Sequence, residues 1–290
     1  MTTSPGLKQV IVTGAFDDLR SPQIRFLEEA ARLGEVTVLL WADELIQQFE
    51  GTPPKFPQAE RAYFLQAIRF VRQVLLVGDS RVEGPRSEMD VGALVAAAGQ
   101  AGVEPDLLVV NEAQDLAANR AVCEARGLRC RVVREEDIRG FPELAPDSPA
   151  SAAGRKRVVV TGCYDWVHSG HVRFFEEVSA YGDLYVIVGH DANIRLLKGA
   201  GHPRFPQEER RYVVGSIRHV KQAMITTGEG WLDADPEIRR LKPDIYAVNE
   251  DGDKGGKREY CAKLGIEYLV LKRVPAPGLP RRTSTDLRGF

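Results

Sequence analysis

Cysteine is scarce in this sequence. Only four of the 290 residues are cysteines, and no two of them form a CxxC pair. So few cysteines in a chain of this length argue against a disulfide scaffold. We therefore predict that Cys123, Cys130, Cys163 and Cys261 are reduced and buried thiols.

The sequence also lacks signals for export, membrane insertion or polyanion binding. The N-terminus, MTTSPGLKQVIVTG, has no basic stretch followed by an apolar one, so it predicts no signal peptide. No apolar run approaches the ~20 residues that span a bilayer. Basic and acidic side chains number 39 and 41, and this balance disfavours a general surface for nucleic acids. These absences predict a soluble, cytoplasmic protein with no membrane span and no nucleic-acid partner.

A long internal repeat is the most informative feature that is present. The stretch TGCYDWVHSGHVRFFEE, from Thr161, agrees at eight of seventeen positions with TGAFDDLRSPQIRFLEE, from Thr13. Two further pairs of segments match in the same order at near-constant spacing. The length fits two domains at ~100–200 residues each. We predict a degenerate domain over residues 1–142, a linker rich in Pro, Ser, Ala and Gly over 143–154, and an active domain over 155–290.

Each half alternates short apolar runs with amphipathic stretches. In the second half RVVVTG, LYVIVGHD, DIYAVNE and EYLVLKR are typical of strands buried on both faces. HVRFFEEVSAYG and QEERRYVVGSIRHV have apolar residues at helical spacing. The alternation predicts an α/β fold with two tandem Rossmann-like domains, each with a parallel sheet and right-handed crossovers. Such sheets bind ligands beyond the carboxyl ends of their strands, where TGCYDWVHSGH joins the first strand to the first helix.

The segment HSGH is the first candidate site. His168 and His171 are three residues apart, so at the start of a helix they lie on one face. Gly170 lets a ligand approach the backbone. The first helical turn offers N–H groups without intrahelical partners and the positive end of the helix dipole, a combination that favours phosphate. Structural histidines or a zinc site would use the same residue types, but no Cys/His cluster supplies further zinc ligands, so we predict no metal site on the protein.

Three motifs in order give the second half a family resemblance. The residues from Gly162 to His171 resemble the GxFDxxHxGH signature of the cytidylyltransferase-like nucleotidyltransferases, with Tyr164 in place of phenylalanine. LLKGAGHPRFPQEERRYVV resembles the lysine-containing loop and helix of this family, and RRTSTDLRG resembles its late Ser-Thr segment. The match covers residues 155–290 and looks most like the ethanolamine-phosphate cytidylyltransferases, whose chains also carry two such domains. It implies transfer of a nucleotidyl group from a nucleoside triphosphate to a substrate phosphate, with release of pyrophosphate.

The resemblance also implies which residues form the site. His168, His171 and Lys198 are the predicted catalytic residues, because they would stabilise negative charge on the phosphates. The remaining residues form a nucleotide-binding set (Thr161, Gly162, Cys163, Tyr164, Gly170, Arg210, Asn249, Arg282, Thr283, Ser284 and Thr285) and an acceptor-binding set (Asp165, Trp166 and Asp191). Mg²⁺ is expected as the cofactor, because it neutralises triphosphate charge.

Several of these residues also have a structural interpretation. Lys198 fits a solvated loop lysine, and Arg210 fits an arginine that pairs with a helix carboxylate. Asp191 fits a helix cap, and Trp166 fits a core residue. Asp165 is expected to order the turn rather than to act as an acid or base.

The late motifs carry the substrate prediction. They favour transfer of CMP from CTP to a phosphorylated small alcohol such as ethanolamine phosphate. Two departures weaken cytosine recognition: GLPRRTST lacks the usual Arg-Thr-x-Gly register, and AVNEDGDKGG differs from the usual end of that strand. An adenylyltransferase that uses ATP and a sugar phosphate or related phosphate is therefore one alternative, and a non-catalytic nucleotide-binding protein is the other.

The first half has lost the residue types that favour phosphate. Arg20 and Gln23 stand in place of the two histidines, and Glu50 stands in place of the lysine. Pro22 replaces the glycine and removes an N–H group from the helix start. Because its apolar pattern persists, we predict a catalytically inactive domain that supports the active one, with a repurposed pocket for another ligand as the alternative. The predicted assembly is a monomer whose domains pair about a pseudo-twofold axis, or a homodimer.

Overall fold

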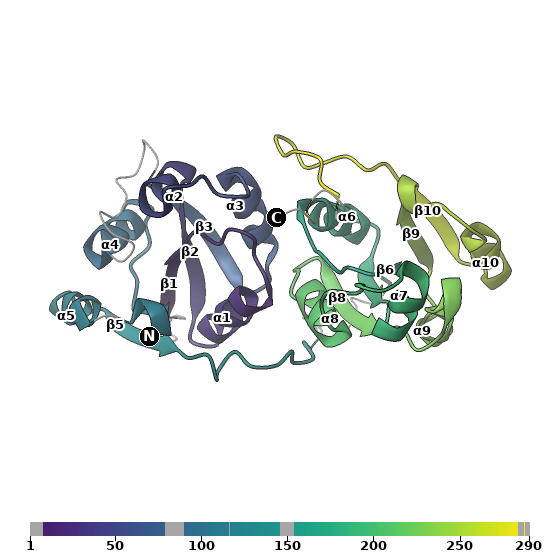
Figure 1. Cartoon of the computed structure of the whole chain (residues 1–290), viewed down its shortest axis with the longest axis horizontal. Helices are drawn as coiled ribbons and strands as arrows, with labels where there is room; N and C mark the ends of the chain where they lie inside the picture. The colour runs from purple at the N-terminus through teal and green to yellow at the C-terminus, as the bar shows by residue number, and fades with distance from the viewer. Residues whose placement is uncertain (1–7, 79–89, 116, 146–153, 284–286, 288–290) are drawn as a thin grey trace. The chain divides into compact units, whose positions relative to one another are not determined.

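The computed structural model describes residues 8–78, 90–115, 117–145, 154–283 and 287. The chain divides into two compact units, Met1–Arg139 and Gly140–Phe290. Each unit is built around a five-stranded sheet with helices on both faces (Figure 1). No helix among the described residues is long and apolar enough to cross a membrane.

The first unit contains a parallel sheet with the strand order β3-β2-β1-β4-β5. Its strands are β1 (Gln9–Gly14), β2 (Glu35–Trp41), β3 (Val71–Val77), β4 (Leu107–Asn111) and β5 (Arg129–Val133). Its helices are α1 (Ser21–Ala31), α2 (Asp43–Glu50), α3 (Gln58–Ala67), α4 (Val91–Gln100), the short 3₁₀ helix η1 (Glu112–Gln114) and α5 (Ala117–Ala125).

The second unit repeats this topology, with the order β8-β7-β6-β9-β10. Its strands are β6 (Arg157–Gly162), β7 (Asp183–Val188), β8 (Val220–Ile225), β9 (Ile245–Asn249) and β10 (Glu267–Leu271). Its helices are α6 (Ser169–Ser179), α7 (Asp191–Lys198), α8 (Gln207–Gly215), η2 (Gly230–Leu232), α9 (Asp235–Leu241), η3 (Glu250–Gly252) and α10 (Lys257–Leu264). The predicted α/β fold with two tandem Rossmann-like domains is confirmed.

The apolar runs form strands because a parallel sheet covered on both faces leaves no strand face in water. Val158, Val159 and Val160 of β6 are almost completely buried. One face of this sheet packs against α9 and α10, in a cluster that includes Ile238 and Cys261. The second unit therefore buries a hydrophobic core of its own.

One predicted helix is shorter than its pattern suggested. The spacing in QEERRYVVGSIRHV predicted a helix to about residue 220, but α8 ends at Gly215. The N–H of Ile217 bonds to the carbonyl of Val214, and the N–H of Val220 bonds to the carbonyl of Ile217, so the chain turns directly into β8. The helix ends early because the chain must pair in the sheet from Val220 onward, and this tertiary requirement overrides the local helical spacing.

The residues that begin the second unit pack on α8. The ring of Phe141 lies 6.1 Å from that of Tyr212, and Arg211 donates to the carbonyl of Phe141 at 3.2 Å. Phe141 thus belongs to the second unit, which begins at Gly140, and the predicted first domain ended at residue 142. Most of the predicted linker, residues 146–153, lies outside the described residues.

Candidate active site

A cavity of about 240 Å³ opens at the carboxyl ends of β6 and β9 in the second unit. Its wall combines the β6–α6 turn, the end of α7, the loop before α8, the corner between β9 and η3, and the residues that start α10 and follow β10. The predicted site residues that line it are Thr161, Gly162, Cys163, Tyr164, Asp165, Trp166, Gly170, His171, Lys198 and Asn249. The edge of the sheet predicted to hold the ligand is therefore the one that forms a cavity.

The β6–α6 turn places both histidines at the start of α6. His168 is the N-cap residue, and its Nδ1 accepts a hydrogen bond from the N–H of Gly170 at 3.1 Å. His171 completes a capping box, because its Nδ1 accepts from the N–H of His168 at 3.4 Å. The ring centroids are 4.0 Å apart. A Cβ atom at Gly170 would lie 2.9 Å from Cε1 of His168, so the glycine lets the imidazole fold over the helix start.

These hydrogen bonds determine where each neutral imidazole carries its proton. Because Nδ1 accepts in both rings, the proton lies on Nε2. Burial lowers the pKa of His171 from 6.5 to about 4, and the positive charges of Arg273 and Lys198 add to this effect. His171 is therefore neutral near pH 7. Because it lines the cavity, its Nε2–H group can donate to a ligand there.

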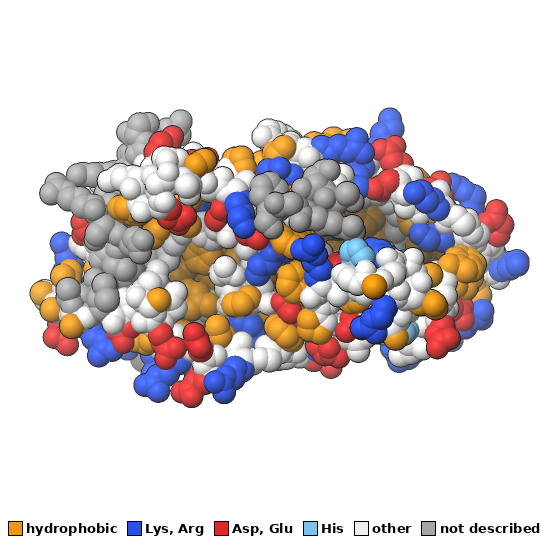
Figure 2. Space-filling model, in the orientation of Figure 1, with side chains coloured by type: hydrophobic (Ala, Val, Ile, Leu, Met, Phe, Trp, Pro, Cys, Tyr) orange, Lys and Arg blue, Asp and Glu red, His pale blue; other side chains and the backbone are white. Residues whose placement is uncertain are grey.

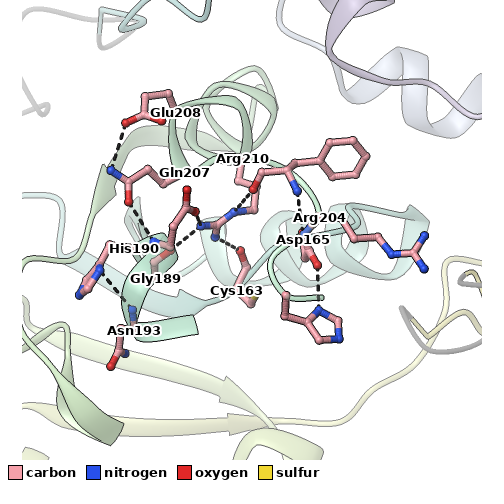
Figure 3. Close-up of polar contacts among 12 residues, drawn as sticks. Cys163, Asp165, Gly189, His190, Asn193, Arg204, Gln207, Glu208 and Arg210 are labelled. Carbon is pink, nitrogen blue, oxygen red and sulfur yellow. Dashed lines mark hydrogen bonds and ion pairs between the residues drawn. The ribbon is translucent and has the colours of Figure 1, made fainter. Parts of the chain in front are cut away.

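Arg210, which was predicted to bind the nucleotide, does not line the cavity. Its side chain is only 1% exposed. The guanidinium donates to the carbonyls of Phe205 at 2.9 Å, Cys163 at 2.5 Å and Gly189 at 2.8 Å, and it pairs with the Oδ1 atom of Asp191 at 2.6 Å (Figure 3). The arginine thus joins the loop before α8 to the ends of β6 and β7.

The first unit contains the same arginine network. Arg61 donates to the carbonyls of Phe56, Ala15 and Trp41 at 2.9, 2.5 and 2.9 Å, and to the carboxylate of Asp43 at 2.7 Å. The unit that lacks the histidines keeps every one of these contacts. We infer that the arginine stabilises the fold at this edge of the sheet in both units.

Asp165 orders a loop of the cavity wall. Its Oδ1 accepts from the N–H groups of Arg204 at 2.6 Å and Phe205 at 3.2 Å (Figure 3). Its Oδ2 lies 3.2 Å from Nδ1 of His202. Asp17 binds the two corresponding N–H groups of the first unit at 2.6 and 2.9 Å. This arrangement matches the expectation that Asp165 orders the turn, and its role in acceptor binding stays a prediction.

Asp191 is also placed differently from its prediction. Its carboxylate pairs with Arg210, and it does not line the cavity. The N-cap of α7 is His190, whose side chain accepts from the N–H of Asn193, so Asp191 is not the cap either. The carboxylate instead neutralises the buried guanidinium of Arg210, in agreement with the structural interpretation that Arg210 pairs with a helix carboxylate.

Five ionisable residues that the sequence did not single out also line the cavity: His202, Arg204, Asp251, Lys257 and Arg273. Arg273 follows β10, pairs with Asp251 and donates to the carbonyl of Arg282 at 2.9 Å. Lys257, at the start of α10, donates to the carbonyl of Gly252 at 2.9 Å, and burial lowers its pKa. One signal in the sequence indicates this part of the cavity. The predicted strands DIYAVNE and EYLVLKR end in charged residues, at the edge of the sheet where a ligand was expected.

The C-terminal segment passes the start of α6. The carbonyl oxygen of Arg282 lies 3.6 Å from a Cβ atom built on Gly170, and both residues line a small second hollow. The carbonyl of Thr283 accepts from the N–H of Leu287 at 3.3 Å, and the Leu287 side chain is fully buried. Ser284 and Thr285, which were predicted to bind phosphates, lie outside the described residues.

The cavity is rich in positive charge. Lys198, Arg204, Lys257 and Arg273 line it, while its two carboxylates, Asp165 and Asp251, are engaged in the contacts described above. Within the described part of the chain, no group of three His, Cys, Asp or Glu side chains could hold a metal ion. Burial raises the pKa of the Cys163 thiol, so that thiol stays protonated near neutral pH. The site is suited to bind polyanions and contains no activated thiolate.

The corresponding turn of the first unit keeps its backbone but not its imidazoles. Phe16 has a φ of 46° and Tyr164 a φ of 52°, a left-handed conformation that side chains rarely adopt. The N–H of Arg20 donates to Oε1 of Gln23 at 3.0 Å, as the N–H of His168 donates to its ring partner in the second unit. Arg20 also pairs with Asp18. The predicted inactivity of this unit stays a prediction.

Comparison with known proteins identifies the family. A family model described as cytidylyltransferase-like matches residues 159–272. The chain is similar to an FAD synthase from Ferroglobus placidus, with 38% identity over 120 residues that make up 40% of this chain and 75% of that one. An FAD synthase from Pyrococcus horikoshii is 43% identical over 120 residues, 40% of this chain and 78% of that one.

A third relative is much longer than the matched region. The bifunctional protein HldE from Nitratiruptor sp. is 34% identical over 139 residues, which cover 47% of this chain and 29% of that one. The three relatives and the family model agree with the predicted family. The chain therefore belongs to the cytidylyltransferase-like nucleotidyltransferases, and it is a nucleotidyltransferase.

Proposed function

We propose that the second unit transfers an adenylyl group from ATP to a phosphorylated small acceptor and releases pyrophosphate. The observation that carries this proposal is the identity of 38% and 43% to two FAD synthases, over 75% and 78% of their lengths. FAD consists of flavin mononucleotide joined to AMP, so its synthesis from flavin mononucleotide is an adenylyl transfer. These relatives favour the adenylyl alternative over transfer of CMP to ethanolamine phosphate.

The geometry of the cavity supports a triphosphate substrate. Lys198, Lys257 and Arg273 line it from three different elements: the end of α7, the start of α10 and the segment that follows β10. His171 adds an uncharged donor at the start of α6, where the helix dipole also favours negative charge. A polyphosphate that enters this space would lose hydrogen bonds to water and gain hydrogen bonds and ion pairs to groups that are already held in place.

The reaction needs no nucleophile from the protein. An oxygen of the acceptor phosphate attacks the α-phosphorus and forms a new P–O bond. The bond from this phosphorus to the oxygen that bridges it to the β-phosphate breaks, and pyrophosphate leaves with the electron pair. His171 and Lys198, which line the cavity, and the buried His168, whose ring packs on that of His171, would stabilise the negative charge that spreads over the phosphate oxygens, while the cavity holds the two substrates in line.

Mg²⁺ fits this site as a companion of the nucleotide. It is usually held by one or two carboxylates together with substrate phosphates, and it neutralises triphosphate charge. In the described residues, the carboxylates that line the cavity already bind the chain's own N–H groups or a guanidinium. We therefore propose that the metal enters with ATP rather than residing on the protein.

A nucleotide and acceptor panel tests the proposal. Pyrophosphate release should be measured with ATP or CTP, Mg²⁺, and flavin mononucleotide, ethanolamine phosphate, glycerol phosphate or a sugar phosphate as the acceptor. We expect ATP to support the higher rate and His171→Ala to abolish it. Arg20→Ala, at the position in the first unit that corresponds to His168, should leave the rate unchanged.

Two results would overturn the adenylyl proposal. A higher rate with CTP and ethanolamine phosphate would establish cytidylyl transfer, the function first predicted from the sequence. No release with any pair, while ATP still raises the melting temperature, would establish a non-catalytic nucleotide-binding protein. Addition of ATP at ~100 times its dissociation constant should stabilise the fold by ~2.7 kcal/mol, which a melting curve resolves.

A further inference from the structure

The first unit contains an open cavity of about 950 Å³, lined by α5, β5 and the residues that follow each of them. Cys123 and Cys130 form part of an apolar wall, together with Leu128 and Val132. Four arginines and three carboxylates complete the lining, and side chains of both charges are visible over α5 and β5 (Figure 2). Pockets of ~300–1,000 Å³ typically bind small molecules, so the size of this one suits a ligand of that kind.

The second unit carries a tyrosine where the wall of this cavity has a cysteine. In β5, Cys130 pairs with Leu108 of the neighbouring strand. At the corresponding positions of the second unit, Tyr268 pairs with Tyr246, and their ring centroids lie 6.1 Å apart. The first unit therefore has smaller side chains at both positions, which leaves room beside α5 where a phenol ring packs beside α10.

The Tyr268 ring is held at two points. Its hydroxyl donates to Oδ1 of Asp253 at 2.9 Å. Its face lies against the guanidinium of Arg258, whose Cζ atom is 4.9 Å from the ring centroid, and a cation in this position attracts the ring. Arg258 also donates to Oδ2 of the same aspartate at 3.2 Å. A carboxylate and a stacked guanidinium thus recognise a phenol ring at this place in the fold.

The first unit keeps the partners of this tyrosine without the tyrosine. Asp115 and Arg120 occupy the positions of that aspartate and arginine. Burial raises the pKa of the Cys130 thiol, and the charges of both residues also act on it, as does a hydrogen bond with Cys123. Cys130 therefore faces the groups that surround the phenol ring in the second unit.

The carboxylate of Asp115 is available to a ligand. Arg120 donates to both of its oxygens, with Nε 2.7 Å from Oδ1. The arginine side chain is 58% exposed, and ion pairs at exposed sites are weak. A hydroxyl group that enters the cavity can therefore take one oxygen while the arginine keeps the other.

We propose that this cavity is a binding site for a small molecule that carries a phenol ring. The ring takes the place that the tyrosine side chain fills in the second unit, against the guanidinium of Arg120, and its hydroxyl donates to Asp115. The positive and negative side chains of the wall nearly balance, so the ring and its hydroxyl, rather than net charge, select the ligand. The site lies in the first unit and does not depend on the transfer reaction proposed for the second.

Para-cresol, which reproduces the tyrosine side chain, is the probe, and the full chain is kept reduced. Saturation-transfer NMR should yield a dissociation constant on the order of 1 mM, because so small a ligand makes few contacts. Toluene, which lacks the hydroxyl, should bind about tenfold more weakly. Cys130→Tyr should abolish binding, because the new ring fills the cavity itself. Cys130→Ser is the matched control, which keeps the cavity and should bind as the wild type does.

A second measurement needs no variant. Cys130 and Cys163 are both partly exposed, so mass spectrometry can follow the alkylation of each thiol in one sample. At about ten times its dissociation constant, para-cresol should slow alkylation of Cys130 about tenfold and leave that of Cys163, in the second unit, unchanged. Undiminished binding by a folded Cys130→Tyr variant, or equal slowing at both thiols, or no slowing at Cys130, would refute the site. Equal affinities for toluene and para-cresol would refute the hydrogen bond to Asp115.

Discussion

His171 should remain neutral at pH values where most histidines are already protonated. Burial lowers its pKa from 6.5 to about 4, and His171→Gln is the variant that isolates this effect. Gln23 performs the same capping function in the first unit, through an Oε1 atom that accepts at 3.0 Å. The glutamine variant should therefore keep the start of α6 intact while it removes the titrating group.

The sign and size of the effect follow from the two pKa values. Because the folded state has the lower pKa, the contribution to stability is complete above about pH 6.5 and is lost as the pH falls toward 4, where the unfolded chain binds a proton that the folded chain does not. At about pH 5 this difference is about 2 kcal/mol, and it approaches about 3 kcal/mol at lower pH. Protonation of Nδ1 would also oppose the N–H of His168.

Two measurements test this reasoning. Urea denaturation at about pH 7.5 and about pH 5 should show that the wild type loses about 2 kcal/mol more than His171→Gln. The chain contains five histidines, so the imidazole signal that disappears from the NMR spectrum of the variant identifies His171. Its nitrogen shifts should report the Nε2–H tautomer and a pKa of about 4. A midpoint near 6.5, the opposite tautomer, or equal losses of stability would refute the proposed buried donor.

Three further predictions concern single side chains. His168→Ala should lower the rate of pyrophosphate release by about 100-fold or more, because it removes a donor and the cap of α6, and a normal rate would place His168 outside the reaction. Lys198→Glu, which introduces the residue found at position 50 of the first unit, should raise the KM for ATP without changing the melting temperature, because Lys198 is exposed; an unchanged KM would indicate a solvated lysine. Arg61→Leu and Arg210→Leu should each lower the free energy of unfolding by about 3 kcal/mol in denaturant titrations, because each leaves three carbonyls and a carboxylate without their donor. If Arg210→Leu loses activity but keeps its free energy of unfolding, the original prediction that Arg210 binds the nucleotide would be supported.

The fold was predictable because its signals are local. Continuous apolar runs such as RVVVTG became β6, and the alternation with helices implied parallel strands. The repeat predicted two units of one topology, and the structure contains two sheets of the same strand order. The boundary of α8 was not predictable in the same way, because the helical spacing continues past Gly215 while the chain must turn into β8.

The site was predictable only where its residues are close in sequence. Eight of the eleven residues from Thr161 to His171 line the cavity, because a strand, a turn and a helix start bring neighbouring residues to one place. Lys257 and Arg273 were missed because a lysine at the start of a helix, or an arginine after a strand, is usually a solvated residue. Only the packing of β9, α10 and β10 beside β6 brings these cations to the histidines.

The amino-acid sequence by itself determined the duplication, the α/β fold, the family and the histidine turn, because each depends on spacing within a short stretch of chain. The tertiary structure decided the functions of individual charged residues. Arg210 and Asp191 matched a ligand-binding pattern, yet the carbonyls of Phe205, Cys163 and Gly189 surround the guanidinium and bury it. A side chain's function depends on the atoms that surround it, and residues distant in the sequence contribute most of those atoms.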